Sequence, residues 1–449
     1  MVGSTICIEY TLKISPPILW FDGPPSVKPS FRKRKRSEAA IAKYIQQNTK
    51  IPTPRILYYS DFSDIGLFVI IERIENKSTL SHALTTPGVD RSITHALDPN
   101  ISQTTLEDLY LKVANIIFEL SQHKFTLIGS LLEADDGSFS VAGRLITQNM
   151  SDMLQLANIP SAIFLPEYKT FRSADEDYLN LARGHLVQLI FQHNDLVKSV
   201  DDCRNKYVAR QLFSQLAKQG RLSTFGFAED DWSAQTKTKT SKLLPAPSNS
   251  DSFRLYGDDF RPGDILINDA NEVVSVTDWE FTYNAPTEFV LDPPWWLLLH
   301  TPEMWDAGIE DWVKKYELRL ETWLSAMKEA EESASSESKS TEFPLSAYMR
   351  ESWETGRFWL DYAGRKSWAF DTVFWRYLDE RFFGRREDGI EKNDLYKIRV
   401  HLLSESARNA MRLFVERKVE EIKERKLVEW EPEAAMSRLA EVYFGCEVE

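Results

Sequence analysis

The stretch YGDDFRPGDILINDANEVVSVTDWEF, Tyr256–Phe281, is the part of the chain from which the fold can be inferred. Its two short β-prone runs, ILI and VVSV, flank the sequence NDAN, whose composition is typical of a tight turn. The stretch therefore predicts an antiparallel hairpin, with Asp264 just before the first strand and Asp278 just after the second. Because antiparallel strands of similar length return the chain to its starting side, both carboxylates are expected at one end.

Asp259 precedes Asp264 by five residues, so a third carboxylate is expected near the same end of the hairpin. Three such groups can bind a divalent cation and orient a hydroxyl group. Phosphoryl transfer requires this equipment, because a metal ion neutralises the nucleotide phosphates while a carboxylate orients the acceptor. Asp-rich turns are common on protein surfaces, and it is the joint spacing that favours a functional interpretation.

The composition of the 449-residue chain indicates a globular protein with two lobes or domains. A net charge of −14 argues against a general nucleic-acid-binding protein, whose surface would be basic. Three cysteines are too few for a disulfide framework or a structural zinc site. Neither a signal peptide nor an apolar run long enough to span a bilayer is visible, so we expect a cytoplasmic protein without membrane attachment.

The central stretch resembles the catalytic core of the aminoglycoside phosphotransferase and choline kinase-like family. A second segment, FTLIGSL at 125–131, resembles one that is common in fungal members of that family. That family has HGDxxxxN followed by IDW or IDF, and this chain has DDFRPGDIL followed by VTDWEF. The resemblance implies that Asp259 is the catalytic residue and that Asp264 and Asp278 bind Mg²⁺. Two positions depart from the pattern, since Gly257 stands where His is common and Asp264 replaces Asn. Mg²⁺ accepts carboxylate oxygens, but an added negative charge beside a triphosphate leaves impaired catalysis open.

The same resemblance implies an α+β, bilobal, protein-kinase-like fold. A small N-terminal nucleotide-binding lobe with an antiparallel sheet is expected over residues 1–76. A large, mainly helical lobe is expected over residues 77–449, with the catalytic loop at 256–281 and a helical acceptor-site region. No GxGxxG or Walker sequence occurs anywhere in the chain. Either the chain begins late relative to a kinase-like lobe, or its small lobe is trimmed.

The N-terminal segment predicts a strand, a loop and a helix. Residues 4–14, STICIEYTLKI, are rich in β-forming residues and predict a strand. Residues 15–30 contain five prolines and predict a loop. SEAAIAKYI, at 37–45, predicts a helix with Ser37 as its N-cap. The basic run RKRKR at 32–36 is interpreted as the solvated entry to this helix, or as a group near phosphates.

The nucleotide contacts in this segment follow from the resemblance alone. Lys13 corresponds to the strand lysine that contacts the α- and β-phosphates, and Glu38 to the helix glutamate that holds it. The hinge that would bind the adenine falls at 72–76, which places Glu72 and Ile74 against the nucleotide. An exposed strand lysine and an ordinary first-turn glutamate remain the alternatives for Lys13 and Glu38.

Beyond the small lobe the sequence predicts helices, with one flexible segment at 328–342 that is poor in apolar residues. The sequence PPWW at 293–296 suggests either a cage for a choline-type cation or, preferably, core packing. His185 and His193 are interpreted as surface or core-edge residues, not as metal ligands. Helices are predicted over 104–123, 174–220, 304–327, 345–383 and 393–427.

The sequence therefore supports two functional hypotheses. The first is ATP- and Mg²⁺-dependent transfer of the γ-phosphate to a hydroxyl of an unidentified small molecule, with Arg261 either stabilising the transferred charge or pairing with a neighbouring acid. The alternative is a catalytically impaired pseudokinase that binds nucleotide or a protein partner. A metal-dependent hydrolase is disfavoured, because no His-rich ligand set accompanies the aspartates.

Overall fold

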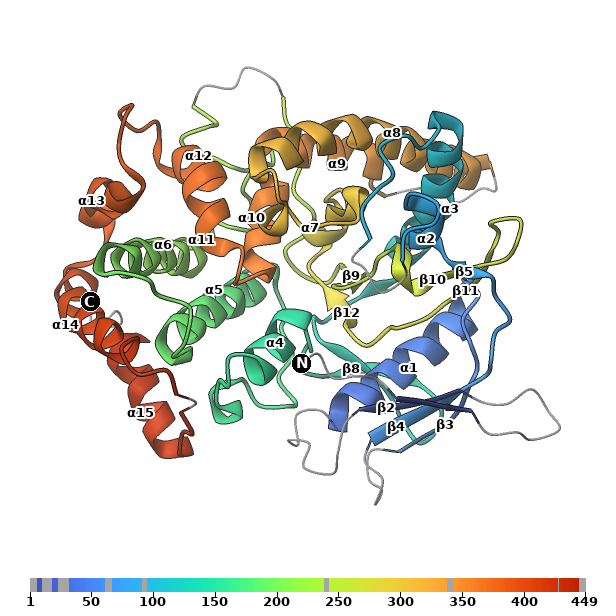
Figure 1. Cartoon of the computed structure of the whole chain (residues 1–449), viewed down its shortest axis with the longest axis horizontal. Helices are drawn as coiled ribbons and strands as arrows, with labels where there is room; N and C mark the ends of the chain where they lie inside the picture. The colour runs from blue at the N-terminus through green and yellow to red at the C-terminus, as the bar shows by residue number, and fades with distance from the viewer. Residues whose placement is uncertain are drawn as a thin grey trace. The chain divides into compact units, whose positions relative to one another are not determined.

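Small antiparallel sheets and numerous helices make up the protein, and this confirms the predicted α+β class (Figure 1). The computed structural model describes residues 6–9, 18–22, 32–60, 67–90, 95–237, 242–336, 342–426 and 428–443. The chain divides into two compact units. The first contains Met1–Thr147, Tyr168–Thr170 and Asp251–Arg350, and the second contains Gln148–Glu167, Phe171–Ser250 and Glu351–Glu449. The predicted lobe boundary after residue 76 stays a prediction.

A four-stranded antiparallel sheet opens the first unit. Its strands are β1 (Ile6–Glu9), β2 (Ile18–Asp22), β3 (Ile56–Ser60) and β4 (Leu67–Ile71), in the order β1-β2-β4-β3. Helix α1 (Arg32–Asn48) connects β2 to β3 and packs on β3 and β4. Its apolar face, which includes Ala39, Ile41 and Ile45, is fully buried, so hydrophobic burial attaches the helix to the sheet.

Three expectations for this segment need correction. The predicted loop at 15–30 contains strand β2, because the run ILWF has strong β propensity despite the prolines around it. Helix α1 begins at Arg32, so the basic run forms its first turn and Ser37 is not its N-cap. Ser37 is instead buried, and its hydroxyl donates to the carbonyl oxygen of Leu131. Glu38 consequently lies in the second helical turn. Of the strand predicted over 4–14, residues 6–9 form β1, and the remaining residues lie outside the described ranges.

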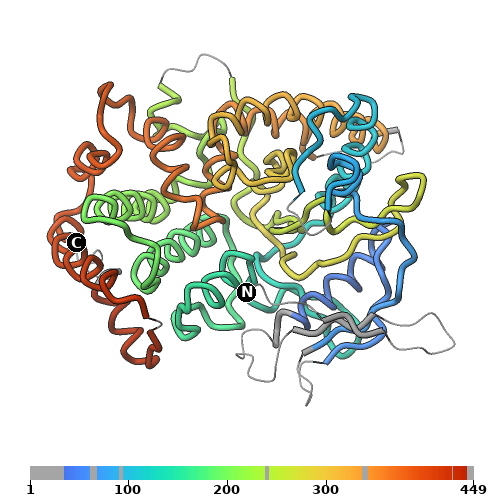
Figure 2. The backbone as a smooth tube through the Cα atoms, in the orientation of Figure 1, coloured from blue at the N-terminus to red at the C-terminus, as the bar shows by residue number. Residues whose placement is uncertain are grey.

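Three further sheets of the first unit place the central stretch. Strand β10 lies between β5 and β11, β9 lies between β6 and β12, and β7 pairs with β8, all antiparallel. The β10–β11 pair is the hairpin that the sequence predicts, and Figure 2 traces the backbone of the unit that contains it. The strands are β5 (Ser78–Thr79), β6 (Lys124–Phe125), β7 (Ser130–Glu133), β8 (Phe139–Gly143), β9 (Phe253–Gly257), β10 (Ile265–Ile267), β11 (Val273–Val276) and β12 (Thr282–Ala285).

The helices of the first unit bury an aromatic cluster. Trp323 is fully buried and meets the rings of Tyr110 and Trp296 edge to face, at centroid separations of 5.8 and 5.4 Å. Trp296 is therefore a core residue, in agreement with the packing interpretation of PPWW. The helices are α2 (Leu80–Leu84), α3 (Gln103–Ser121), α7 (Thr287–Val290), α8 (Ile309–Ser336) and the short η3 (Pro262–Asp264), η4 (Trp295–Leu298) and η5 (Pro302–Met304).

Helix α8 corrects the first part of the predicted flexible segment at 328–342, since the helix continues to Ser336. Residues 337–341 lie outside the described ranges. Ala330 is buried, and Glu331 accepts hydrogen bonds from the backbone and hydroxyl of Ser346. These contacts hold a stretch whose composition alone indicated disorder. Among the helices that the structure describes, none is both long and apolar enough to cross a membrane.

The second unit is built mainly of helices. The predicted helical run at 174–220 is interrupted at 192–199, between α5 and α6, which pack on one another. His185 is buried, and its Nε2 lies 3.0 Å from the carbonyl oxygen of Gly364. The elements are α4 (Gln148–Gln155), η2 (Ser161–Ile163), α5 (Ala174–Phe191), α6 (Val200–Lys218), α10 (Arg357–Arg365), α11 (Phe370–Val373), the π-helical η6 (Phe374–Leu378), α12 (Asp379–Phe383), η7 (Lys392–Asp394), α13 (Leu395–Arg399), η8 (Val400–Leu402), α14 (Glu405–Glu421) and α15 (Pro432–Tyr443), and α9 (Leu345–Thr355) joins the two units in sequence.

Candidate functional site

The hairpin brings Asp264 and Asp278 to one end of the same strand pair. In the β10–β11 ladder Ile265 pairs with Val276, and beyond it the backbone N–H of Thr277 donates to the carbonyl oxygen of Asp264 at 2.8 Å. The two aspartates therefore flank adjacent strand ends, as the spacing in the sequence predicts. The antiparallel geometry is sufficient to explain this placement.

Gly257 ends strand β9 in a turn that has no room for a side chain. The N–H of Phe260 donates to the carbonyl oxygen of Gly257 at 3.2 Å, and a Cβ added at Gly257 would lie 2.6 Å from the Cβ of Phe260. Phe260 in turn stacks on Trp279, with nearly parallel rings 6.0 Å apart. Any side chain at position 257 would therefore clash with Phe260 unless the turn moved.

Asp264 is the most deeply buried of the three aspartates. Burial, followed by the charge of Asp278, raises its pKa well above the ordinary value for a carboxyl group. One of its oxygens, Oδ2, accepts a hydrogen bond of 2.9 Å from the backbone N–H of Arg261. The residue thus closes the turn of η3 as well as facing Asp278.

Asp278 occupies a left-handed backbone conformation with φ = 60°, which is uncommon outside glycine and asparagine-like residues. Asp278 as a whole residue is exposed, but the protein atoms around its carboxyl group remove part of the water from that group. This desolvation, followed by the charge of Glu38, raises the pKa of Asp278, while Lys35 acts in the opposite direction. Asn and Asp adopt this conformation more readily than other non-glycine residues, and Asp195 and Asp251 share it.

Arg261 lies close to the aspartates. Its guanidinium is 3.9 Å from Oδ2 of Asp259, and the charges of Asp259 and then Asp264 raise its pKa. The side chain is about half exposed, at 52%, so the ion pair contributes little to stability. Of the two interpretations left open by the sequence, the structure supports the pairing with a neighbouring acid.

Lys35 is a residue of this site that the sequence interpretation did not single out. Its Nζ lies 2.8 Å from Oε2 of Glu38 and 3.7 Å from Oε2 of Glu280, and the side chain is only 8% exposed. The available signal was the basic run RKRKR, which places Lys35 three residues before Glu38. Lys13 lies outside the described residues, so its contact with phosphates stays a prediction.

The predicted hinge follows strand β4. The N–H of Glu72 donates to the carbonyl oxygen of Arg55 at 2.9 Å, and the two side chains form an ion pair. The carbonyl oxygen of Ile74 accepts from the side chain of Asn76 at 3.0 Å. The N–H of Lys77 then donates to Ile267 of β10 at 2.8 Å. The segment therefore joins the N-terminal sheet to the hairpin, while nucleotide contacts of Glu72 and Ile74 stay a prediction.

A divalent cation suits the charge of this site better than any other simple group. Within the described ranges, no group of three or more His, Cys, Asp or Glu side chains is close enough to hold a metal alone. The charges of Asp278 and Asp259 nevertheless raise the pKa of Asp264, and a cation bound beside them would oppose that effect. Mg²⁺ usually takes one or two carboxylates and completes its shell with phosphate oxygens and water. The residues present therefore fit a nucleotide-bound Mg²⁺.

Comparisons with known proteins found similarities only among solved structures. No family model matches the chain, and no curated protein matches it. A ternary complex of APH(2")-IIa with streptomycin and ATP is 11% identical, with a TM-score of 0.38 over 85% of this chain and 94% of that one. ADP-bound aminoglycoside phosphotransferase APH(2'')-Ib is 12% identical, with a TM-score of 0.38 over 91% and 94%. A putative aminoglycoside phosphotransferase from Ralstonia eutropha is 11% identical, with a TM-score of 0.35 over 95% of both chains.

Proposed function

We propose that the protein is a phosphotransferase of the aminoglycoside phosphotransferase type, which uses ATP and Mg²⁺ to phosphorylate a hydroxyl group of a small molecule. The observation that carries the proposal is the set formed by Asp259, Asp264 and Asp278, whose charges interact at one end of the β10–β11 hairpin. We further propose that the reaction takes place in the cytoplasm and involves neither a nucleic acid nor a membrane.

In the proposed mechanism Asp259 orients the acceptor hydroxyl and accepts its proton as the phosphoryl group is transferred. The side chain of Asp259 is 21% exposed, which leaves it accessible to a small substrate. Asp264 and Asp278 would hold the metal ion. Mg²⁺, when bound, supplies neutralisation of the phosphate charge and polarises the transferred group. The excess of carboxylates here explains why free triphosphate, without a metal, would be repelled.

Lys35 supports this proposal as a cation close to the metal ligands. Its charge already stabilises ionised Asp278, and Glu38 fixes its position from the next turn of α1. We propose that Lys35 contacts phosphate oxygens when nucleotide binds. Lys13 would add a second phosphate contact, and Glu72 and Ile74 would border the adenine.

The alternative is a pseudokinase that binds nucleotide or a protein partner without turnover. The state of Asp264 favours this alternative, because burial and the charge of Asp278 promote its neutral form. A protonated carboxyl group binds metal more weakly than a carboxylate does. One of its oxygens is also already engaged by the N–H of Arg261.

A thermal-shift titration of the full chain with ATP and Mg²⁺ tests nucleotide binding, which the phosphotransferase and the nucleotide-binding pseudokinase have in common. We expect a rise in melting temperature that requires both components. Absence of any rise at millimolar nucleotide would contradict nucleotide binding altogether.

Turnover is tested by measuring ATP consumption with a panel of hydroxyl acceptors that includes aminoglycosides and choline-like amines, since the acidic chain suits cationic acceptors. We expect activity in the unmodified protein and a loss of about 10²-fold or more in Asp259→Asn. Asp269→Asn is the matched control, because Asp269 lies in the hairpin turn and is almost fully exposed. Nucleotide binding without activity across the panel would favour the pseudokinase.

A further inference from the structure

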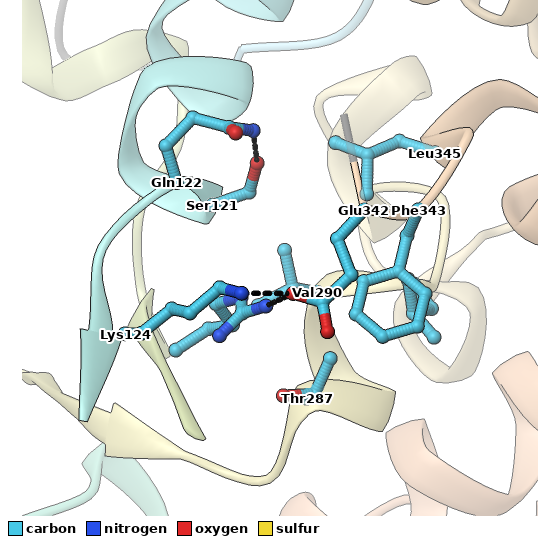
Figure 3. A pocket seen from close by; sticks show the side chains of 10 residues that line it. Ser121, Gln122, Lys124, Thr287, Val290, Glu342, Phe343 and Leu345 are labelled. Carbon is cyan, nitrogen blue, oxygen red and sulfur yellow. Dashed lines mark hydrogen bonds and ion pairs between the residues drawn. The ribbon is translucent and has the colours of Figure 1, made fainter. Parts of the chain in front are cut away.

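The first unit contains a polar cavity whose lining includes none of the three aspartates of the acidic site, and Figure 3 shows the side chains that line it. Its volume is about 70 Å³, and a single water needs only about 10–15 Å³ measured in this way. The cavity therefore has room for a small polyatomic ion. The end of α3, strands β6 and β9, helix α7 and the start of α9 contribute to its lining, which includes Ser121, Lys124, Arg254, Thr287 and Glu342.

Arg254, on strand β9, is the buried cation of this cavity. Its side chain is only 3% exposed, and two of its N–H groups have acceptors among the described residues. Nη1 donates to the hydroxyl oxygen of Ser252 at 3.2 Å, and Nη2 donates to Oε2 of Glu342 at 2.6 Å. A guanidinium group has five N–H donors. In the part of the chain that the structure describes, three donors of this buried group therefore have no protein acceptor.

The charges around the cavity do not balance. Lys124 and Arg254 both contact the same oxygen, Oε2 of Glu342, with Nζ of Lys124 at 2.5 Å. Glu342 is the carboxylate that neutralises them, and its own side chain is 44% exposed. Two cations thus face one partly solvated carboxylate. Burial lowers the pKa of Arg254 although Glu342 opposes that effect, which indicates that the carboxylate compensates the burial incompletely.

The polar groups beside these charges do not supply another acceptor to Arg254. The hydroxyl of Ser121 donates to the carbonyl oxygen of Phe118 at 2.6 Å, and the side-chain amide of Gln122 donates to the Ser121 oxygen at 2.9 Å. The hydroxyl of Thr287 donates to the carbonyl oxygen of Ser252. Figure 3 shows the side chains of Ser121, Gln122 and Thr287 together with the ion pair between Lys124 and Glu342. The cavity offers an anion one buried and one exposed cation, together with unused N–H donors.

We propose that this cavity is a binding site for a small oxyanion of the inorganic phosphate class, and that the carboxylate of Glu342 competes with the anion for Arg254 and Lys124. Guanidinium groups bind such anions through paired, charge-assisted hydrogen bonds. When the anion binds, Glu342 gives up its place on the guanidinium and turns to solvent, where it is already partly exposed. The site is distinct from the acidic cluster, because Asp259, Asp264 and Asp278 do not line the cavity.

Equilibrium dialysis of the full chain against radiolabelled inorganic phosphate measures binding independently of folding stability. Ionic strength is held constant with potassium chloride, since exposed charges are screened by salt. The variants are Glu342→Gln, which removes the competing charge, and Lys124→Gln, which removes the exposed cation. Glu321→Gln and Lys315→Gln are the controls, because they alter comparably exposed ion pairs elsewhere in the first unit.

We expect phosphate to bind the unmodified protein, roughly fivefold or more tightly to Glu342→Gln, and roughly tenfold more weakly to Lys124→Gln. The two controls should bind as the unmodified protein does. Binding that is equal in all five proteins would place the phosphate elsewhere and overturn the proposal. Failure of both the unmodified protein and Glu342→Gln to bind would overturn it as well, and would leave the Arg254–Glu342 contact as a purely structural ion pair.

Discussion

Replacement of Gly257 by alanine should disrupt the turn that carries Asp259. The added Cβ would lie 2.6 Å from the Cβ of Phe260, whereas carbon atoms pack at about 3.5 Å or more, so one of them must move by about 0.9 Å. Phe260 cannot yield freely, because its ring stacks on the buried Trp279. Overpacking of this kind costs about 1–3 kcal/mol. We expect Gly257→Ala to lower the free energy of unfolding by that amount.

Gly263→Ala is the matched control for this substitution. Gly263 lies six residues further along, in η3, and has an ordinary backbone conformation. Its added Cβ would be 4.0 Å from the nearest atom beyond its chain neighbours, Nε of Arg261. Alanine there should be neutral or stabilise by up to about 1 kcal/mol through the unfolded chain. Urea unfolding followed by tryptophan fluorescence compares the two variants. Equal midpoints for Gly257→Ala and Gly263→Ala would refute the steric reasoning.

Three other predictions address the site and the core. Lys35→Met should weaken ATP·Mg²⁺ binding by roughly tenfold in calorimetric titrations. The control is Lys43→Met, which removes another lysine of α1, one that pairs with Glu133 of β7, and this variant should bind normally. Equal affinities of the two variants would exclude a phosphate contact for Lys35. Trp323→Ala should destabilise the protein by about 3–5 kcal/mol, because Trp323 is fully buried, and the exposed Leu318→Ala on the same helix should change stability by less than about 0.5 kcal/mol in the same urea assay. Burial and then the charge of Arg210 hold the pKa of His185 well below 6.5, so as the pH falls through 6.5 the imidazole is protonated in the unfolded chain before it is in the folded one. The free energy of unfolding should therefore decline there by up to about 1.4 kcal/mol per pH unit from this group. His185→Phe should show a shallower decline between pH 7.5 and 5.5, and an unchanged slope would contradict the lowered pKa of His185.

The hairpin was predictable because its information is local. Two β-prone runs around NDAN fix the turn, and the antiparallel register then places Asp264 and Asp278 at one end. The helical periods of α3 and most of α8 are equally local, since buried residues recur at i, i+3 and i+4. Patterns of this kind do not depend on distant parts of the chain.

The errors arose where distant contacts override local signals. Ser37 has the character of an N-cap, but it is buried against Leu131, and α1 extends through the basic residues before it. Strand β2 was obscured by prolines on both sides and is stabilised by pairing with β1 and β4. Lys35 could be recognised only once α1 included it, because the contact with Glu38 depends on both residues sharing one helix face. Tertiary context therefore decided these three features.

The position of strand β10 has a consequence for how the protein folds. β10 pairs with β11, its immediate neighbour in sequence, and also with β5, which belongs to a much earlier part of the chain. The hairpin can form as soon as its own residues are available. Its pairing with β5, however, requires closure of the long loop formed by the chain between β5 and β10. Lys77 donates to Ile267 across this same seam. The carboxylates of the site are thus expected to reach their final setting late in folding, after the long-range pairing has closed.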